Sequence, residues 1–397
     1  MAFSAIVGDI IRLSATEGVL DPASPAAEQL ALAVGEAPPE VFEIVPQAAW
    51  FHGTAAYTYE AIRNLGLPEK AVNDLKHLRD RTAMLHLRTL TDLAYLDSAL
   101  GDADIPWMVF KGPTLAEPVH GSAQHRSYGD LDVLVRATSL RDALCALEAT
   151  GSRLTDRNWT LIDDRLKGEV HLELPSGTQL DLHWHLFNGR ARRHLFPVSI
   201  DELFARSREV DVSGRLVRTL SLADTVVYVA MHMLHSGGHR LIWLKDVERL
   251  LAMPEIEPTE VAERARAWQA EVVLVSALRR VELAFGAIPH ADIVRANCGQ
   301  HRAWLATASW AWRRCPAERE DGRGSLGRIV SRSARRNQAE CFRELLRRSI
   351  LHLWHRREEP LDGSRELPSD DPRSAGFESG GQARRESFLQ RVSEQQS

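Results

Sequence analysis

The sequence lacks the features that identify a membrane protein, a secreted protein or a zinc-ribbon protein. No window approaches roughly 18 consecutive apolar residues, the length that a membrane span requires. Asp9 and Arg12 interrupt the first apolar stretch, which argues against a signal-peptide core. The cysteines, at positions 145, 298, 315 and 341, include no Cys-x-x-Cys pair, and such scattered cysteines are typical of a reducing compartment. We therefore expect a cytoplasmic protein with no membrane partner.

A strong excess of one charge is also absent. The net charge of −5 and the isoelectric point near 6.4 argue against a dedicated nucleic-acid binder, although they leave room for a local basic patch. The segment 323–357 is such a patch, since it holds ten arginines and two glutamates. This pattern is most typical of a solvated helix face, and a surface for RNA or for a polyphosphate-bearing substrate is the alternative.

Two short segments place acidic side chains on one face of a β-strand. The first reads Asp-Leu-Asp-Val-Leu-Val, so that Asp130 and Asp132 share a face while the apolar side chains point to the core. In the second, Asp181 and His183 share a face for the same reason. If the two strands are neighbours, three carboxylates converge. Such a cluster requires protons or cations to neutralise it, and its oxygen ligands suit Mg²⁺, with Mn²⁺ as the alternative.

His183 has two open interpretations. In the first it orients a phosphate or accepts a proton within the cleft, because it faces the same side as Asp181. In the second it is a hydrogen-bonded histidine that supports Asp181. The strand pattern favours neither.

A lysine-glycine turn precedes the first acidic strand. Residues 105–110 are apolar and end at Lys111 and Gly112. A glycine lets the backbone approach a ligand closely, and a lysine supplies a compact positive charge for a triphosphate. Arg126, four residues before Asp130, either contacts a phosphate or balances the charge of the carboxylates. These three residues are the candidate nucleotide-binding residues.

The remainder of the chain shows helical periodicity on both sides of a mixed middle segment. We expect an α+β protein: an N-terminal helical bundle over residues 1–103, a small mixed β-sheet core over 104–220, and a C-terminal helical domain over 221–357. The last helix of the N-terminal bundle should cover about 69–100. Two hairpins are expected, one over 169–185 and one over 210–217. Residues 358–397 are poor in aromatic residues and are expected to be disordered.

The order of these elements carries a resemblance to known proteins. A strand, a Lys-Gly turn, a helix, an Asp-x-Asp strand and a later single-Asp strand together resemble the DNA polymerase beta-type nucleotidyltransferase superfamily. More narrowly, residues from about 75 to 251 resemble the bacterial uncharacterised nucleotidyltransferase family. The motifs that carry this closer resemblance are Phe-Lys-Gly at 110–112, Arg-Ser-Tyr-Gly-Asp-Leu-Asp-Val-Leu-Val at 126–135, Leu-Asp-Leu-His-Trp at 180–184, His-x-x-His at 232–235 and Leu-Ile-Trp-Leu-Lys-Asp at 241–246. The superfamily's usual Gly-Ser pair is replaced here by Lys111-Gly112, as in this narrower family.

The resemblance implies an enzyme and assigns roles to its residues. It implies a Mg²⁺-dependent transfer of a nucleoside monophosphate from a nucleoside triphosphate such as ATP to the hydroxyl or phosphate of an acceptor. Asp130, Asp132 and Asp181 would hold two metal ions, and Lys111 with Gly112 would position the triphosphate. The acceptor is left open between a small molecule, a peptide, a protein and RNA.

Two other functions are considered. The first is an accessory or antitoxin-like binding protein on the same fold with little catalysis, although the presence of all three aspartates weighs against it. The second is a His/Asp metallophosphohydrolase that would use His232, His235, His239 and Asp246. A Gly-Gly pair at 237–238 should break the helix between the second and third histidines, so a structural role is favoured for this group.

Overall fold

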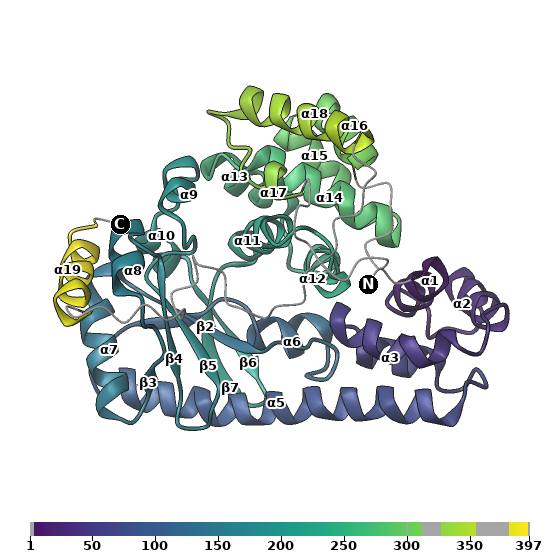
Figure 1. Ribbon diagram of the computed structural model, residues 1–397, viewed down its shortest axis with the longest axis horizontal. Coiled ribbons are helices and arrows are strands. Elements are labelled where there is room, and N and C mark those ends of the chain that lie inside the picture. The colour runs from purple at the N-terminus through teal and green to yellow at the C-terminus, as the bar shows by residue number, and fades with distance from the viewer. Residues whose placement is uncertain (1–3, 300, 312–326, 355–380, 396–397) are drawn as a thin grey trace. The chain divides into compact units, whose positions relative to one another are not determined.

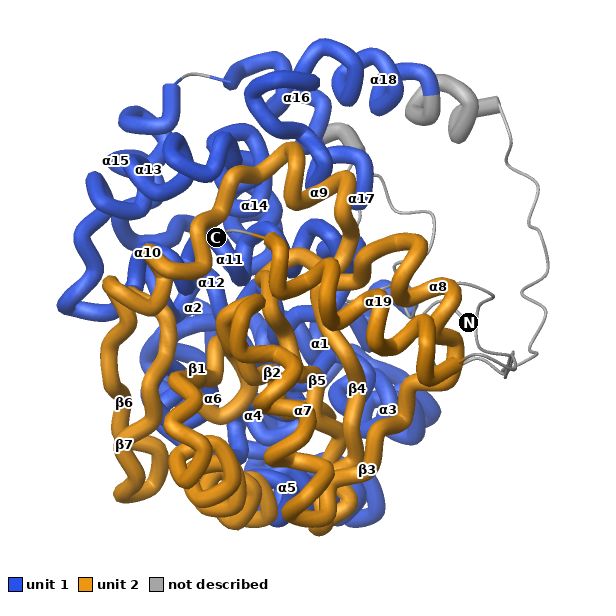
Figure 2. The backbone as a smooth tube through the Cα atoms, turned by 90° about the vertical axis from the view of Figure 1, so that its left-hand side faces the viewer, with its two compact units in different colours: residues 1–86, 115–128, 222–353 blue, residues 87–114, 129–221, 354–397 orange. Residues whose placement is uncertain are grey.

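The structure is a computed structural model that describes residues 4–299, 301–311, 327–354 and 381–395. It combines many helices with a small mixed β-sheet, which confirms the predicted α+β class. The described residues form two compact units, shown in two colours in Figure 2. Unit 1 comprises Met1–His86, Leu115–Tyr128 and Leu222–Leu353, and unit 2 comprises Leu87–Thr114, Gly129–Ser221 and Trp354–Ser397. The domain boundaries expected from the sequence stay predictions.

Unit 1 is helical. Its first helices pack around a core that includes Val7, Ile10, Val45 and Leu75, all of which are fully buried. Side-chain caps begin two of these helices, since the hydroxyl of Ser4 accepts from the Val7 N–H and α2 starts with a proline directly after its capping serine. The helices are α1 Ala5–Ser14, α2 Pro25–Gly35, α3 Val41–His52, α4 Ala55–Ile62, α5 Glu69–Gly101 in its first part, α6 Pro113–His120 in its larger part, α11 Leu222–His235, α12 Leu241–Leu251, α13 Pro258–Ala267, α14 Glu271–Phe285, α15 Ala291–Cys298, α16 Arg302–Ala311, α17 Gly327–Val330 and α18 Gln338–Trp354.

Unit 2 is built on a five-stranded sheet with the order β1-β2-β5-β4-β3. Strands β2 and β5 are parallel neighbours, and the other pairs are antiparallel. A separate hairpin joins β6 to β7. The strands are β1 Trp107–Val109, β2 Asp130–Val135, β3 Arg153–Leu154, β4 Glu169–Glu173, β5 Gln179–His183, β6 Arg208–Val212 and β7 Arg215–Thr219, and the helical segments are η1 Ala137–Ser139, α7 Leu140–Ala149, α8 Trp159–Arg165, α9 Arg190–Leu195, α10 Ile200–Ala205 and α19 Gly381–Ser393.

The apolar face of this sheet forms the core of unit 2. Leu131 and Val133 of β2 are fully buried with Leu180 and Leu182 of β5. Further apolar side chains of this core come from the last third of α5, from α7 and from α8. The alternation in both acidic strands is therefore confirmed, because their apolar residues lie in the core.

Most helices and hairpins expected from the sequence are present. The long helix expected over 69–100 is α5, and both expected hairpins form, as β4–β5 and β6–β7. Gly177 has a φ of 83° in the first hairpin turn, a conformation that glycine adopts without strain. Among the described residues, no helix combines the length and the apolar content that crossing a bilayer requires.

The C-terminal segment corrects one expectation. Residues 358–397 were expected to be disordered, but 381–393 form helix α19, which lies beside α8 (Figure 1). Phe388, Leu389 and Val392 of α19 are buried in the core of unit 2. Arg391 donates to Asp163 at 2.6 Å, so that ion pairs supplement the small apolar face. The earlier part of the tail, residues 358–380, lies outside the described residues.

Candidate functional site

The two acidic strands are neighbours, as the sequence predicted. In the parallel ladder of β2 and β5, Asp132 is directly opposite Asp181, and Asp130 is opposite Gln179. Each of Asp132, Asp181 and His183 offers a ligand atom, and these atoms lie within 4.8 Å of one another. Within the described part of the chain, this is the group of three side chains whose geometry suits a metal ion.

Asp132 is the buried centre of this group, with 1% of its surface exposed. Its Oδ1 lies 2.8 Å from Lys111 Nζ and 3.2 Å from His183 Nε2. Its Oδ2 is buried and accepts no hydrogen bond from the residues that the structure describes. Burial alone would raise the pKa of Asp132, but the charges of Lys111 and His183 hold it well below its ordinary value. A carboxylate oxygen with a lowered pKa and no hydrogen-bond donor among the described residues is suited to binding a cation.

Asp181 differs from Asp132 in its protonation. Burial, followed by the charges of Asp132, Glu169 and Asp130, raises the pKa of Asp181 to about 7. The half-buried Asp130 therefore acts on this carboxyl through its charge, although it is not one of the three closest side chains. Without a cation the cluster retains a proton close to neutral pH, because its carboxylates repel one another. This competition between proton and cation is typical of a divalent-metal site.

His183 contacts Asp132 more closely than the sequence suggested. Its Nε2 lies 3.2 Å from Asp132 Oδ1, and its Nδ1 lies 3.3 Å from Glu169 Oε2. The ring of Phe110 packs edge-on against the imidazole, with centroids 4.9 Å apart. Burial opposes a charge on His183, but Glu169 and Asp132 together raise its pKa. These contacts support both a positioning role and a direct role, as the strand pattern did.

The sequence interpretation missed two residues of β4. Glu169 pairs in register with His183, and His171 pairs with Asp181, so both share the acidic face. His171 Nε2 lies 3.5 Å from Glu169 Oε1 and 3.9 Å from Asp181 Oδ1, and its Nδ1 lies 2.8 Å from Asp156 Oδ1. Despite burial, hydrogen bonds to Asp156 and Glu169 raise the pKa of His171 to about 11. This histidine is therefore a fixed positive charge on the acidic face.

The alternation of Glu169-Val170-His171-Leu172-Glu173 was a signal that could have identified these residues. The other acidic residue of this alternation, Glu173, does not join the group. Glu173 lies opposite Gln179 at the other end of β4 and pairs with Arg153 at 3.0 Å. Its position in the ladder places it beside Arg153, not beside Asp181.

Lys111 and Gly112 form the predicted turn. Gly112 has a φ of 67°, a left-handed conformation that favours glycine, and helix α6 starts at the next residue. The hydroxyl of Thr114 donates to the carbonyl oxygen of Lys111 at 3.3 Å, which links the turn to the helix. The turn thus directs the Lys111 ammonium to Asp132.

Arg126 belongs to unit 1, where it is buried beside a different carboxylate. Its Nε and Nη2 donate to Asp246 at 2.7 and 3.0 Å. His120 Nε2 lies 2.8 Å from the same carboxylate, and His120 Nδ1 lies 2.8 Å from the hydroxyl of Tyr57. The charge that Arg126 balances in this structure is therefore that of Asp246, and a phosphate contact stays a prediction.

The histidines of unit 1 pack against aromatic rings. His232 and His239 are both edge-on to the indole of Trp243, with centroids 5.4 and 5.3 Å apart. Helix α11 ends at His235 and α12 begins after the Gly-Gly pair, as expected. In the described residues, neither these histidines nor Asp246 belongs to a group with metal-ligand spacing. The packing supports the structural role for this group.

Comparison with known families agrees with this site. No curated protein matches the chain. A family model described as "Uncharacterised nucleotidyltransferase" matches residues 43–286, a region that includes the Lys-Gly turn, both acidic strands and β4. The match extends over well over half of the 397 residues, and the chain therefore belongs to the uncharacterised nucleotidyltransferase family.

Proposed function

We propose that this protein is a Mg²⁺-dependent nucleotidyltransferase that moves a nucleoside monophosphate from a nucleoside triphosphate to an acceptor hydroxyl. One observation carries the proposal: the ligand atoms of Asp132, Asp181 and His183 lie within 4.8 Å, and Asp132 Oδ2 is buried without a hydrogen-bond donor among the described residues. Family membership supports the same class of reaction.

The residues present fit a divalent cation. Asp130, Asp132 and Asp181 would hold Mg²⁺, because they supply the hard carboxylate oxygens that this ion prefers. Mn²⁺ is the alternative ion, since the adjacent imidazole of His183 suits a transition metal. When bound, the metal would lower the pKa of the acceptor hydroxyl and stabilise the charge that develops on pyrophosphate.

In the proposed reaction, the residues of the site have distinct roles. The acceptor oxygen forms a bond to the α-phosphorus, the bond from that phosphorus to the α,β-bridging oxygen breaks, and pyrophosphate leaves. The hydroxyl proton passes to Asp181 or to solvent. When the triphosphate binds, the Lys111 ammonium would leave the Asp132 carboxylate and pair with the triphosphate instead. His183 and Glu169 would keep the Asp132 carboxylate oriented.

A binding and transfer experiment tests the proposal. Melting temperatures would be measured with Mg²⁺ and each of ATP, CTP, GTP and UTP, and label transfer from the stabilising nucleotide would be followed in a cell extract. Asp132→Asn should abolish both the Mg²⁺-dependent stabilisation and the transfer. Asp142→Asn, which removes an exposed carboxylate from α7, should change neither.

The outcomes separate the candidate functions. Transfer that persists in Asp132→Asn would contradict the assignment of the site. Nucleotide binding without transfer in the wild-type protein would instead favour the accessory, antitoxin-like alternative. The three aspartates do not determine whether the acceptor is a small molecule, a peptide, a protein or RNA.

A further inference from the structure

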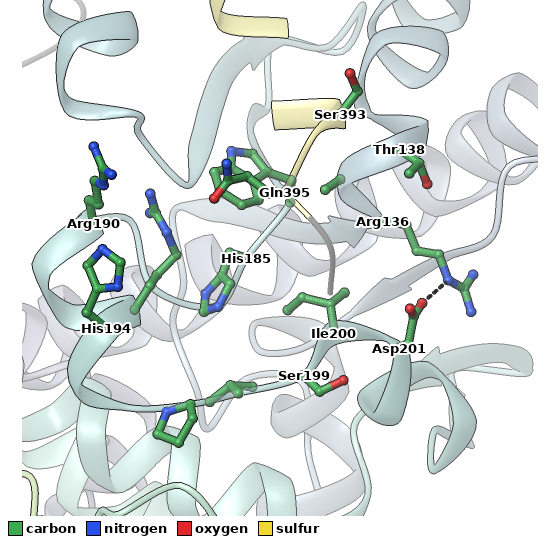
Figure 3. A pocket seen from close by; sticks show the side chains of 15 residues that line it. Arg136, Thr138, His185, Arg190, His194, Ser199, Ile200, Asp201, Ser393 and Gln395 are labelled. Atoms are coloured by element: carbon green, nitrogen blue, oxygen red, sulfur yellow. Dashed lines mark hydrogen bonds and ion pairs between the residues drawn. The ribbon is translucent and has the colours of Figure 1, made fainter. Parts of the chain in front are cut away.

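Unit 2 contains a pocket of about 720 Å³ at the carboxyl ends of the two acidic strands (Figure 3). Arg136 directly follows β2, and Trp184 and His185 directly follow β5. Because β2 and β5 are parallel, these residues lie at the same edge of the sheet. Arg136 follows Asp132 by four residues and His185 follows Asp181 by four residues, so the pocket lies at the ends of the same two strands that carry the acidic cluster.

The lining of this pocket carries an excess of positive charge. Arg136, Arg190 and Arg193 line it, and among its described residues Asp201 is the one carboxylate. Asp201 accepts from Arg136 at 2.7 Å, an ion pair that is visible in Figure 3. Two guanidinium charges are therefore left without a carboxylate in the lining. His194, which lies beside Arg190 in Figure 3, adds a further polar ring.

The two uncompensated arginines differ in what holds them. Arg193 donates to the carbonyl oxygens of Leu166, Phe187 and Asn188. Its guanidinium also lies over the ring of Trp184, with 4.6 Å from Cζ to the centroid. It is thus fixed in place by neutral groups. Arg190 is exposed, and the described residues provide it with neither a hydrogen bond nor an ion pair. Its guanidinium is available to an anion.

Part of the pocket lining is apolar and buried. Trp184 and Ile200 are 2% and 3% exposed, and Val198 is also buried. A volume of this size suits a small organic molecule, and an apolar floor with a few charged groups at the rim is typical of such a site. The lining therefore fits a ligand with an organic body and an anionic group.

We propose that this pocket binds a small organic phosphomonoester, and that this molecule is the acceptor of the nucleotidyl group. A phosphomonoester carries close to two negative charges at pH 7, which matches the two uncompensated guanidinium groups. Guanidinium groups also bind phosphate oxygens through paired hydrogen bonds. The second part rests on the proposed function, in which a hydroxyl of the bound molecule attacks the α-phosphorus.

Binding is tested first, without any transfer. Calorimetric titrations would use ribose 5-phosphate and inorganic phosphate as probes and ribose as the neutral comparison. Arg190→Gln should weaken ribose 5-phosphate binding by about tenfold, as expected for the loss of one charge-assisted hydrogen bond. Arg192→Gln removes the same charge from the same helix at a residue that does not line the pocket, and it should bind as the wild type does.

Three binding results would overturn the assignment of the pocket. These are equal affinities in Arg190→Gln and Arg192→Gln, equal affinities for ribose and ribose 5-phosphate, and no saturable binding at millimolar concentrations. Asp132→Asn should retain the binding of ribose 5-phosphate, because it leaves the pocket lining unchanged. This variant separates a failure of the pocket from a failure of the catalytic cluster.

The acceptor role is tested with the small-molecule fraction of a cell extract. One half of the fraction would be treated with phosphatase, which is removed before labelled nucleotide, Mg²⁺ and protein are added. Labelled product should form with the untreated half and disappear with the treated half. Arg190→Gln should require more of the untreated fraction for half-maximal product, with an unchanged Michaelis constant for the nucleotide. Product that survives phosphatase treatment would overturn the acceptor assignment, and no product from either half would overturn the proposed function itself.

Discussion

Lys111 Nζ lies 2.8 Å from Asp132 Oδ1, so the ammonium holds the carboxylate oxygen that a divalent cation would otherwise share. Lys111 is 17% exposed and Asp132 is 1% exposed at their side chains, which makes this a largely desolvated pair. A desolvated carboxylate that loses its partner is strongly destabilising. We therefore expect the pair to stabilise the metal-free protein and to compete with the metal binding that we propose for this cluster.

This competition gives the first prediction. Lys111→Ala should lower the free energy of unfolding of the metal-free protein by on the order of 3 kcal/mol, because Asp132 loses one of its two cationic neighbours. The same change should tighten Mg²⁺ binding and raise the Michaelis constant of the nucleotide. Urea unfolding and metal titration would measure the two effects. Lys76→Ala, an exposed lysine of α5, is the control; weaker Mg²⁺ binding in Lys111→Ala would contradict the competition.

Glu169 gives the second prediction, which concerns a residue that the sequence interpretation missed. Glu169→Gln keeps the shape of the side chain but removes the charge beside His183 and His171. We expect turnover to fall by about 10- to 100-fold, as is common when a group that orients metal ligands is changed. Steady-state kinetics would be compared with Glu173→Gln on the same strand face, whose partner is Arg153. Equal turnover in both variants would place Glu169 outside the catalytic arrangement.

Helix α19 gives the third prediction. Phe388→Ala should destabilise unit 2 by about 3–5 kcal/mol, because the aromatic ring is fully buried in the core. A chain that ends before Gly381 should lose at least as much stability. Gln390→Ala, an exposed position on the same helix, should leave the melting temperature nearly unchanged. If Phe388→Ala and Gln390→Ala have the same melting temperature, the helix contributes little to the stability of the core.

His120 gives the fourth prediction, on pH dependence. Burial, which outweighs the hydrogen bond to Asp246, lowers the pKa of His120 to about 4. The unfolded chain takes up a proton at His120 near pH 6.5 and the folded protein only near pH 4, so the contribution of this histidine to stability should fall as pH falls through this window. The loss from this histidine should be roughly 2–3 kcal/mol.

Urea unfolding between pH 7 and pH 4 would measure this loss. Asp246 should not contribute within the same window, because Arg126 and His120 hold its pKa below the ordinary value against the effect of burial. His120→Gln should flatten the pH profile, whereas His77→Gln, an exposed histidine of α5, should not. Asp181, His171 and His185 also have shifted pKa values, so the test is the difference between the two proteins. If the pH profiles of the wild type and of His120→Gln run parallel, His120 is not held neutral.

The sequence was sufficient for features that depend on neighbouring residues along the chain. Alternation of side chains placed the acidic residues of β2 and β5 on one face, and turn residues located both hairpins. The position of Asp132 opposite Asp181 also requires the two strands to be adjacent, which the sequence could only suggest. The contacts of Glu169 with His183 depend on the antiparallel register of β4, which a single strand does not reveal.

Two other features required partners that are distant in sequence. Arg126 pairs with Asp246, which lies 120 residues further along the chain. The sequence around Arg126 could not distinguish this carboxylate from those of the acidic cluster. Helix α19 has only a narrow apolar stripe, and its composition resembles that of a disordered tail. Its order comes from the core of unit 2 and from the carboxylate of Asp163, neither of which is visible in the segment itself.

The interleaving of the two units along the chain has a consequence for how the protein folds during synthesis. Unit 2 takes its sheet from Leu87–Thr114 and Gly129–Ser221, and α19 adds to its core. The segment Leu222–Leu353 of unit 1 is synthesised between the sheet and α19. Domains usually fold in order as they leave the ribosome. Here the sheet with the acidic cluster must wait, with an incomplete core, while most of the other unit is being made. If a ribosome stalls before Gly381, we therefore expect unit 1 of the nascent chain to resist protease and the sheet of unit 2 to be readily cleaved.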